Sequence, residues 1–396
     1  MSSGLVVLVL AMLLGIQPVT TDLYLPALPA LTEGFSASMS QAQLTLSALL
    51  LAFGISQLIW GPLSDRFGRR PILLCGLTAY TLASIASTLS PSMAQLIGWR
   101  IVQGAAMGAA VMCARAIVRD LYQPQDGARI MSKGLSGLGA LACTFAPLGG
   151  LLSELFGWRV ALMALAVFGC ITLALVALRF QETLQHKNPQ ALHPATLFRT
   201  WLEILRNPTF LAFSALSAAT YGGLFTFLAT SSFVFIRILG LSNAGYGLMM
   251  FFISIAYIAG TFLCRHLLPR FGLRQSVAIA GALCLTGGVL MGLLAWAGVQ
   301  NVWAIILPQL LFMVGHGINQ PCGQSGAVGP FPQSAGAASA VNGFLMMVVA
   351  FGIGGWLGTR MDGTVMPLAN GMFFWGAVIA VAAWTAVRKY GEPAHA

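Results

Sequence analysis

The sequence carries little charge, and acidic residues are especially scarce. Only 8% of its 396 residues are charged, against roughly 25% in soluble domains. Ten are Asp or Glu, twenty are Lys or Arg, and 58% of all residues are hydrophobic. This composition excludes a soluble catalytic domain and indicates a polytopic membrane protein.

Cysteines are few and lack the spacing of a metal site. They are odd in number, form no CxxC motif, and fall within or at the ends of apolar stretches. We interpret them as small core residues and expect neither a disulfide nor a bound metal. The seven are Cys75, Cys113, Cys143, Cys170, Cys264, Cys284 and Cys322.

Two function classes lack the residues that they require. A membrane enzyme needs a nucleophile, an acid/base pair or a ligand set, and one deep carboxylate with scattered histidines does not supply them. The formal charge is +10, but the basic residues form no stripe interleaved with aromatics. We therefore expect no enzymatic activity, no cofactor and no nucleic-acid partner.

Long apolar runs fill nearly all of the chain. A membrane span needs about 20 residues, so this length leaves room for about twelve spans with short connections. The runs are continuous rather than alternating, which favours helices over a barrel. The fold is therefore predicted to be an all-α integral membrane protein, with spans at residues 5–31, 41–64, 72–90, 93–118, 131–154, 158–178, 208–236, 243–264, 275–298, 302–321, 335–358 and 366–388.

The longest connection divides these spans into two sets of six. A weak internal repeat supports two related halves, because RFGRR at 66–70 follows the second span and RFGLR at 270–274 follows the eighth. Repeated halves around a midplane site are a common transporter plan. We predict an N-terminal half at 1–178, a cytoplasmic linker at 179–207 and a C-terminal half at 208–396.

Basic residues gather on one side of the predicted spans. Lys and Arg accumulate in cytoplasmic loops, so we expect both termini in the cytoplasm. Only Arg159, Arg237 and Arg360 fall on the other side. The residues at even-to-odd connections or near the C-terminus are Arg66, Arg69, Arg70, Arg115, Arg119, Arg129, Lys133, Arg179, Lys187, Arg199, Arg206, Arg265, Arg270, Arg274, Arg388 and Lys389.

Two ionisable residues lie deep within predicted spans. Asp22 is about 9 residues, roughly 13 Å, from the far end of the first span, and Arg100 is about 7 residues, roughly 10 Å, into the fourth. Such groups are costly in hydrocarbon and usually face a bundle interior. Asp22 and Arg100 are predicted to border one cavity and to couple proton uptake to transport. The alternative is a static ion pair between the two helices.

Four sequence segments resemble motifs of the major facilitator superfamily. GPLSDRFGRRP at 61–71 looks like its loop between the second and third helices, and Arg100, Gln103 and Gly104 match its RxxQG motif. The segment from Gly139 to Gly150 is similar to its helix-five antiporter motif, with Ala146 at a usual glycine position. DLYLPALP from Asp22 resembles the first helix of the Bcr/CflA group of drug:proton antiporters.

The resemblance implies the fold, location and activity of a secondary transporter. We expect a twelve-helix protein of the bacterial inner membrane, most simply a monomer, whose partners are the lipid bilayer, protons and a small-molecule substrate. It is predicted to export amphiphilic compounds, such as chloramphenicol-like or bicyclomycin-like antibiotics, by alternating access. Asp22 is the expected proton carrier because a related subgroup's second acid is absent, with Leu14 and Gly15 in that region.

The same resemblance assigns conformational roles to two motifs. Asp65, Arg69 and Asp120 are predicted to form a cytoplasmic latch that stabilises the outward-open state, although the loop's arginines also serve as plain topology signals. The glycines and proline of helix five are predicted to serve antiport, with close packing as the alternative. The latch prediction covers Gly61, Asp65, Arg66, Gly68, Arg69, Arg70 and Asp120, and the helix-five prediction covers Gly139, Pro147, Gly149 and Gly150.

A substrate cavity needs apolar walls and a few oriented polar groups. His316 is also considered as a second proton carrier because an unperturbed histidine titrates near neutral pH, with a neutral packing role as the alternative. Several aromatic, polar and methionine residues lie on helices that we expect to face the cavity. They are Tyr24, Gln57, Gln103, Met107, Tyr221, Phe225, Tyr257, His316 and Asn319.

Other transport classes remain open at this point. The main alternative is a facilitator-family exporter of a metabolite, such as a nucleoside, sugar or amino-acid derivative. A channel is disfavoured by the two-halves plan, and a receptor lacks the long signalling domain that it would use. No strictly acidic cavity is evident, which argues against obligate recognition of multiply cationic drugs.

Overall fold

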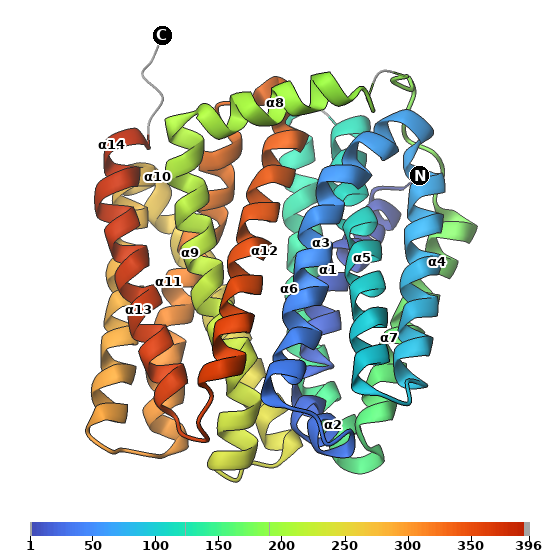
Figure 1. The fold of residues 1–396 in the computed structure, drawn as a ribbon. Coiled ribbons are helices and arrows are strands. Elements are labelled where there is room, and N and C mark those ends of the chain that lie inside the picture. Colours follow the sequence, from blue (N-terminus) through green and yellow to red (C-terminus); the bar gives the residue numbers. More distant parts are fainter. Residues whose placement is uncertain (1, 123, 190, 392–396) are drawn as a thin grey trace.

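In the computed structural model, which describes residues 2–122, 124–189 and 191–391, long helices account for nearly all of the chain (Figure 1). The outer limits of the predicted halves, residues 1 and 392–396, and residue 190 of the predicted linker lie outside the described residues. The helices are α1 (Ser3–Asp22), α2 (Leu28–Gly34), α3 (Met39–Phe67), α4 (Arg69–Thr88), α5 (Met93–Leu121), α6 (Pro124–Phe156), α7 (Trp158–Arg179), α8 (Pro194–Arg206), α9 (Pro208–Ser232), α10 (Asn243–Trp296), α11 (Val302–Val328), α12 (Ala335–Arg360), α13 (Met366–Ala382) and α14 (Arg388–Tyr390).

Local sequence explains where several of these helices begin. Ser38 and Gln41 form a capping box at the start of α3, in which each side chain accepts a hydrogen bond from the other residue's backbone N–H. Asn207 caps α9, and Pro208 occupies its first turn, where a missing N–H costs nothing. Gly68, with φ of 110°, separates α3 from α4 in a conformation that favours glycine.

The described residues contain eleven helical segments that are long and apolar enough to cross a membrane. One of them, α10, has 54 residues and would extend about 80 Å, far more than a hydrocarbon core of about 30 Å. Its helical geometry breaks at Gly272, where φ is 72° and ψ is 178°. Two spans therefore lie within α10, which brings the total to the predicted twelve.

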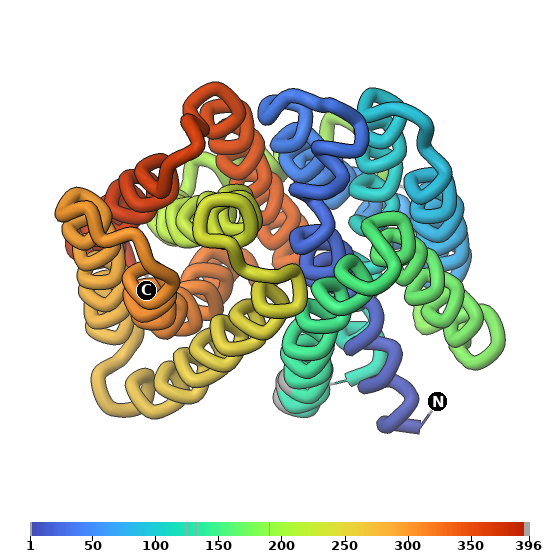
Figure 2. Tube along the Cα trace, turned by 90° about the horizontal axis from the view of Figure 1, so that it is seen from below, coloured from blue at the N-terminus to red at the C-terminus, as the bar shows by residue number. Residues whose placement is uncertain are grey.

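The helices form two bundles that lie side by side (Figures 1 and 2). One contains α1 to α7 and the other α9 to α14. The two meet along two lines of contact, α3 against α12 and α6 against α10. The start of α1, the end of α14 and the whole of α8 lie toward one face of the molecule, here termed the terminal face; the other end of the bundle, where α2 lies, is termed the opposite face.

Two features of the fold depart from the sequence prediction. The linker contains a helix, α8, that was not expected, because 13 residues are too few for a span and its apolar residues occupy only one side. The first span is interrupted: α1 ends at Asp22, a short 3-10 turn (Leu25–Ala27) follows, and α2 then begins. Pro26 and Pro29 fit this interruption because each removes a backbone donor.

Candidate functional site

Asp22 occupies the last position of α1, inside the membrane-spanning bundle. A carboxylate at a helix C-terminus is disfavoured by the helix dipole. Its side chain is half-buried and accepts one hydrogen bond, from the Thr21 hydroxyl at 3.3 Å. Among the ion pairs between described residues, none includes Asp22. The site therefore holds an acid without a compensating cation.

The segment around Asp22 also meets the C-terminal half. The 3-10 turn that follows Asp22, Leu25–Ala27, packs against α9 and α10. Tyr221 of α9 accepts a hydrogen bond from the Gln17 side chain of α1, at 3.3 Å. Asp22 thus belongs to the N-terminal half but lies in a segment that contacts both halves.

Arg100 is fully buried, and the structure does not pair it with Asp22. Its Nη1 donates to Gln103 Oε1 at 2.7 Å, and Gln103 in turn donates to Ser84. The guanidinium also lies 4.2 Å from the centroid of the Tyr24 ring, an attractive cation–π geometry. The alternative of a static Asp22–Arg100 ion pair is therefore wrong, because Tyr24 rather than Asp22 contacts the arginine.

Two nitrogen atoms of Arg100, Nε and Nη2, lack a hydrogen-bond partner in the described structure. A buried, incompletely paired guanidinium is costly, so neighbouring groups must stabilise it. Tyr24, which is fully buried and donates to Thr45 of α3 at 2.7 Å, supplies part of that support. The polar groups of Tyr24 and Gln103, both predicted to contact substrate, are thus hydrogen-bonded within the N-terminal half.

The predicted latch residues come together at the terminal face. Arg69 donates to Asp65 at 2.7 Å and, through Nε and Nη2, to both carboxylate oxygens of Asp120 at 2.9 and 3.3 Å. The Arg69 side chain is only 1% exposed, so these ion pairs are shielded from solvent. Arg66 instead lies over the Phe67 ring, and Arg70 donates to the carbonyl of Ala177.

Glu182, in the linker after α7, completes this network and was missed by the sequence analysis. Its carboxylate accepts hydrogen bonds from the backbone N–H groups of Arg69 and Arg70 at 2.9 and 3.0 Å. Neither N–H group has a partner within the helix, because both lie at the start of α4, where the helix dipole favours an anion. The neighbouring Thr183 hydroxyl donates to Asp120 at 3.2 Å. The linker is thus bound to the latch rather than free of it.

All of these latch contacts lie within the first half of the chain and the segment that follows it. They occur in a structure whose two halves are also joined at the opposite face. There Arg237 donates to the Pro29 carbonyl at 2.8 Å and pairs with Glu33 at 2.9 Å. Glu154 accepts from the first turn of α10 at 2.8 Å. The latch contacts therefore form while the halves are joined at the opposite face. That they stabilise an outward-open state stays a prediction.

The helix-five residues lie on α6, where two of the glycines permit close contact. A Cβ at Gly149 would fall 2.7 Å from the Cα of Leu23, directly after Asp22. At Gly150 it would meet the backbone of Asn243 in the other half. Gly139 has ordinary space, and Pro147 lies inside the helix. Packing thus explains Gly149 and Gly150, and it also joins α6 to the interruption at Asp22.

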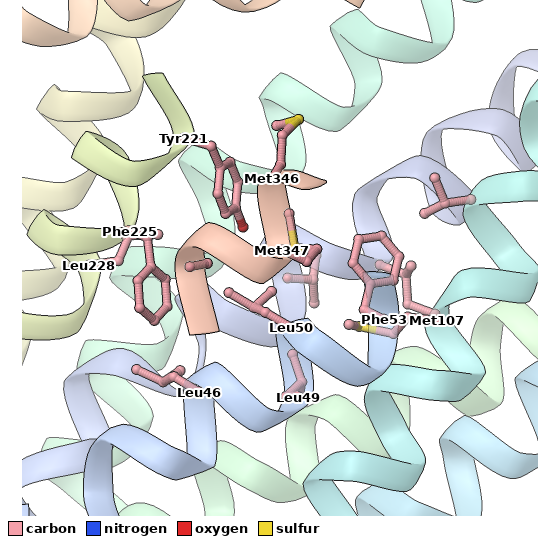
Figure 3. Packing of buried hydrophobic residues seen from close by; sticks show 14 of the residues in the cluster. Leu46, Leu49, Leu50, Phe53, Met107, Tyr221, Phe225, Leu228, Met346 and Met347 are labelled. Carbon is pink, nitrogen blue, oxygen red and sulfur yellow. The ribbon is translucent and has the colours of Figure 1, made fainter. Parts of the chain in front are cut away.

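Several predicted substrate residues lie in one apolar cluster where the halves meet. Figure 3 shows Met107 of α5 and both Tyr221 and Phe225 of α9 in this cluster, which also contains residues of α3 and α12. We term it the central cluster. Its labelled members are Leu46, Leu49, Leu50, Phe53, Met107, Tyr221, Phe225, Leu228, Met346 and Met347.

The remaining predicted substrate residues are dispersed. Gln57 is buried against Gly343 of α12, at the contact between halves. Tyr257 donates to Gln320, and its ring lies 5.6 Å from that of His316. Asn319 is fully buried and donates to the thiol sulfur of Cys284 on α10. Its amide therefore contacts another helix of its own half.

The described residues contain no group of three or more His, Cys, Asp and Glu side chains that could hold a metal ion, and all seven cysteines are free. Two features mark the site instead: an acid without a paired cation at the interruption of the first span, and an apolar cluster where the halves meet.

Comparison with known proteins relates this chain to drug-resistance transporters. It is 30% identical over 345 residues to multidrug resistance protein D of Escherichia coli, covering 86% of this chain and 85% of that protein. It is 30% identical to a chloramphenicol resistance protein of Pseudomonas aeruginosa, covering 81% and 75%. It is 26% identical to a bicyclomycin resistance protein homolog of Haemophilus influenzae, covering 96% and 94%.

Solved transporter structures share the fold at low sequence identity. A D-xylose-proton symporter has a TM-score of 0.75 with 15% identity, covering 96% of each chain. The human organic anion transporter MFSD10 has a TM-score of 0.70 with 19% identity, covering 98% of this chain and 100% of that one. A family model described as the Major Facilitator Superfamily matches residues 10–355. The chain therefore belongs to the major facilitator superfamily of transporters, and it is not an enzyme.

Proposed function

We propose that this transporter exports small amphiphilic compounds from a bacterial cytoplasm in exchange for protons. The observation that carries the proposal is Asp22: a half-buried carboxylate inside the bundle, without a paired cation, at the interruption of the first span. An acid in such a place is expected to be functional, because holding it there is costly. The names of the relatives, which include chloramphenicol and bicyclomycin resistance proteins, support drugs as substrates.

The central cluster supports an apolar substrate. Its leucines, phenylalanines and methionines come from both halves, so a molecule bound there would contact both halves at once. Methionine side chains are flexible and polarisable, and they adapt to ligands of different shape. We therefore assign substrate contact first to Met107, Tyr221 and Phe225, and only secondarily to Gln57, Tyr257 and His316. Asn319 is the weakest of these candidates because its amide donates to Cys284.

The proposed cycle uses the two halves as rigid units around this site. Asp22 takes up a proton from outside, substrate binding from inside favours proton release, and the proton gradient resets the cycle. Arg100 remains charged throughout and shapes the field within the N-terminal half, although it does not pair with Asp22. Arg69 and its partners keep the terminal face of that half rigid.

Orientation follows from the charged surface. The terminal face carries the latch arginines together with Arg388 and Lys389 of α14, so we assign it to the cytoplasm. The predicted linker, residues 179–207, would then lie on the cytoplasmic side, between the end of α7 at Arg179 and the start of α9 at Pro208.

An Asp22→Asn variant tests the proposal. The amide has the same shape but cannot bind and release a proton, so uphill efflux should cease while chloramphenicol still moves down its gradient. Accumulation of labelled chloramphenicol in energised everted vesicles measures the first, and counterflow in de-energised vesicles measures the second. Retained uphill transport by the variant would sink the assignment of Asp22.

A further inference from the structure

Two of the seven cysteines face each other where α10 packs against α11. The sulfur atoms of Cys264 on α10 and Cys322 on α11 lie 3.6 Å apart, in hydrogen-bonding contact. Both residues are buried, with only 3% and 1% of their surface exposed. No other two cysteines make such a contact among the residues that the structure describes. These two thiols therefore form a pair, whereas the other five are single.

A close contact between the two helix backbones holds the pair together. A Cβ at Gly317 of α11 would fall 3.0 Å from the Cα of Gly260 of α10. Gly260 precedes Cys264 by four residues, and residues at this spacing lie on the same face of a helix. The Cys264 sulfur also lies 4.0 Å from the carbonyl oxygen of Ile318, four residues before Cys322. Both thiols thus lie on the faces along which the two helices touch.

The pair lies nearer to the terminal face than to the opposite face. The first span of α10 starts at the opposite face, so its break at Gly272 lies toward the terminal face. Cys264 precedes this break by eight residues, about 12 Å, and Cys322 precedes the end of α11 at Val328 by six, about 9 Å. A small uncharged oxidant therefore has to pass only about two turns of helix to reach the thiols.

We propose that Cys264 and Cys322 are a site of oxidative modification, at which a peroxide closes a reversible disulfide between α10 and α11. One thiol gives up its proton and attacks an oxygen of hydrogen peroxide, which yields a sulfenic acid and one water molecule. The second thiol attacks the sulfenic sulfur, and the disulfide forms with release of a second water. The two thiols together lose two electrons and two protons, and the peroxide is reduced to water.

The geometry demands little movement for this reaction. A disulfide bond is about 2.05 Å long, so the two sulfur atoms have to approach by about 1.5 Å. Both helices belong to the C-terminal half, so the bond would not restrain one half against the other. It would close a loop between positions 58 residues apart and lower the entropy of the unfolded chain. Oxidation should therefore stabilise the folded protein, whatever the transported substrate is.

The test uses the purified wild-type protein in detergent, treated with hydrogen peroxide or with dithiothreitol. Each sample is denatured in N-ethylmaleimide, digested and examined by mass spectrometry. We expect peroxide to produce a linked peptide that contains Cys264 and Cys322 and that dithiothreitol separates. Cys284 is the internal control: it is equally buried and contacts the Phe312 carbonyl rather than a thiol, so it should stay free.

Thermal unfolding supplies a second measurement. The melting temperature of the peroxide-treated protein should exceed that of the reduced protein by several degrees. In Cys264→Ser, which lacks one of the two thiols, peroxide should not raise it. Free thiols at both positions after peroxide has consumed the exposed Cys75 would overturn the inference. Oxidation of both to sulfinic acids without a linked peptide, or an equal loss of the Cys284 thiol, would overturn it as well.

Discussion

Arg237 offers a quantitative test of how the halves are held together at the opposite face. Replacing it by glutamine removes the hydrogen bond to the Pro29 carbonyl, at 2.8 Å, and the ion pair with Glu33, at 2.9 Å. Both partners belong to the N-terminal half, whereas Arg237 lies in the last turn of the π-helix (Phe233–Ile238) that follows α9. The change therefore removes a direct link between the halves without touching the central cluster.

The free energy lost in Arg237→Gln follows from the exposure of the Arg237 and Glu33 side chains. The Glu33 side chain is 71% exposed, so solvent screening limits the ion pair to less than about 1 kcal/mol. The Arg237 side chain is 33% exposed, and its hydrogen bond to a carbonyl contributes about 1.5–3 kcal/mol before screening. We expect a combined loss of about 1.5–3 kcal/mol. The ratio of closed to open molecules at this face should fall by about ten- to a hundredfold.

Cys143 provides the assay because it is half-buried on α6, whose Gly149 packs against the backbone of Asp22 and Leu23. In a variant that retains only this cysteine, a membrane-impermeant thiol reagent added from outside should label it faster when Arg237 is glutamine. Glu33→Gln should increase labelling by no more than about fivefold, and Arg360→Gln, at an exposed arginine of the same face, should not change it. Unchanged labelling in Arg237→Gln would refute the reasoning.

Two further predictions concern packing and the linker. Glu182→Ala removes the carboxylate that caps α4, which should cost about 0.5–2 kcal/mol of folding free energy. The melting temperature, measured by thiol-dye unfolding in detergent, should therefore fall by a few degrees. Glu203→Ala, in an exposed ion pair, is the control and should have no effect. An equal shift in both variants would count against the cap. Gly149→Leu inserts a side chain against Leu23 and should abolish efflux or expression, whereas Gly139→Ala should be tolerated; equal efflux in the two would contradict the close contact at Gly149.

The spans were predictable because an uninterrupted apolar run of about 20 residues can be recognised from the sequence alone. The structure confirms twelve spans once α10 is divided at Gly272, a glycine that also lies in the predicted repeat. The linker helix α8 was not predicted, since its apolar residues occupy only one side of a short polar segment. Length and hydropathy thus identify the membrane spans and miss a short amphipathic helix between them.

Side-chain partners were harder to predict than depth. Equal depth left open a static ion pair between Asp22 and Arg100, but depth along a helix does not fix the direction in which a side chain points. The guanidinium of Arg100 lies instead over the ring of Tyr24, two residues after Asp22. The Asp65, Arg69 and Asp120 cluster was predicted through the family resemblance, whereas Glu182 binds backbone N–H groups more than 100 residues away, which no local pattern signals.

The most direct test of the account is the response of protons to drug in everted membrane vesicles with an acidic lumen. A pH-sensitive dye is followed as chloramphenicol and then a panel of other antibiotics and nucleosides are added, with Asp22→Asn vesicles of matched expression alongside. The account predicts proton release from the lumen on addition of a drug, and no release in the Asp22→Asn vesicles. Equal release in both would contradict the role of Asp22, and a response to nucleosides alone would replace the drug exporter with a metabolite exporter.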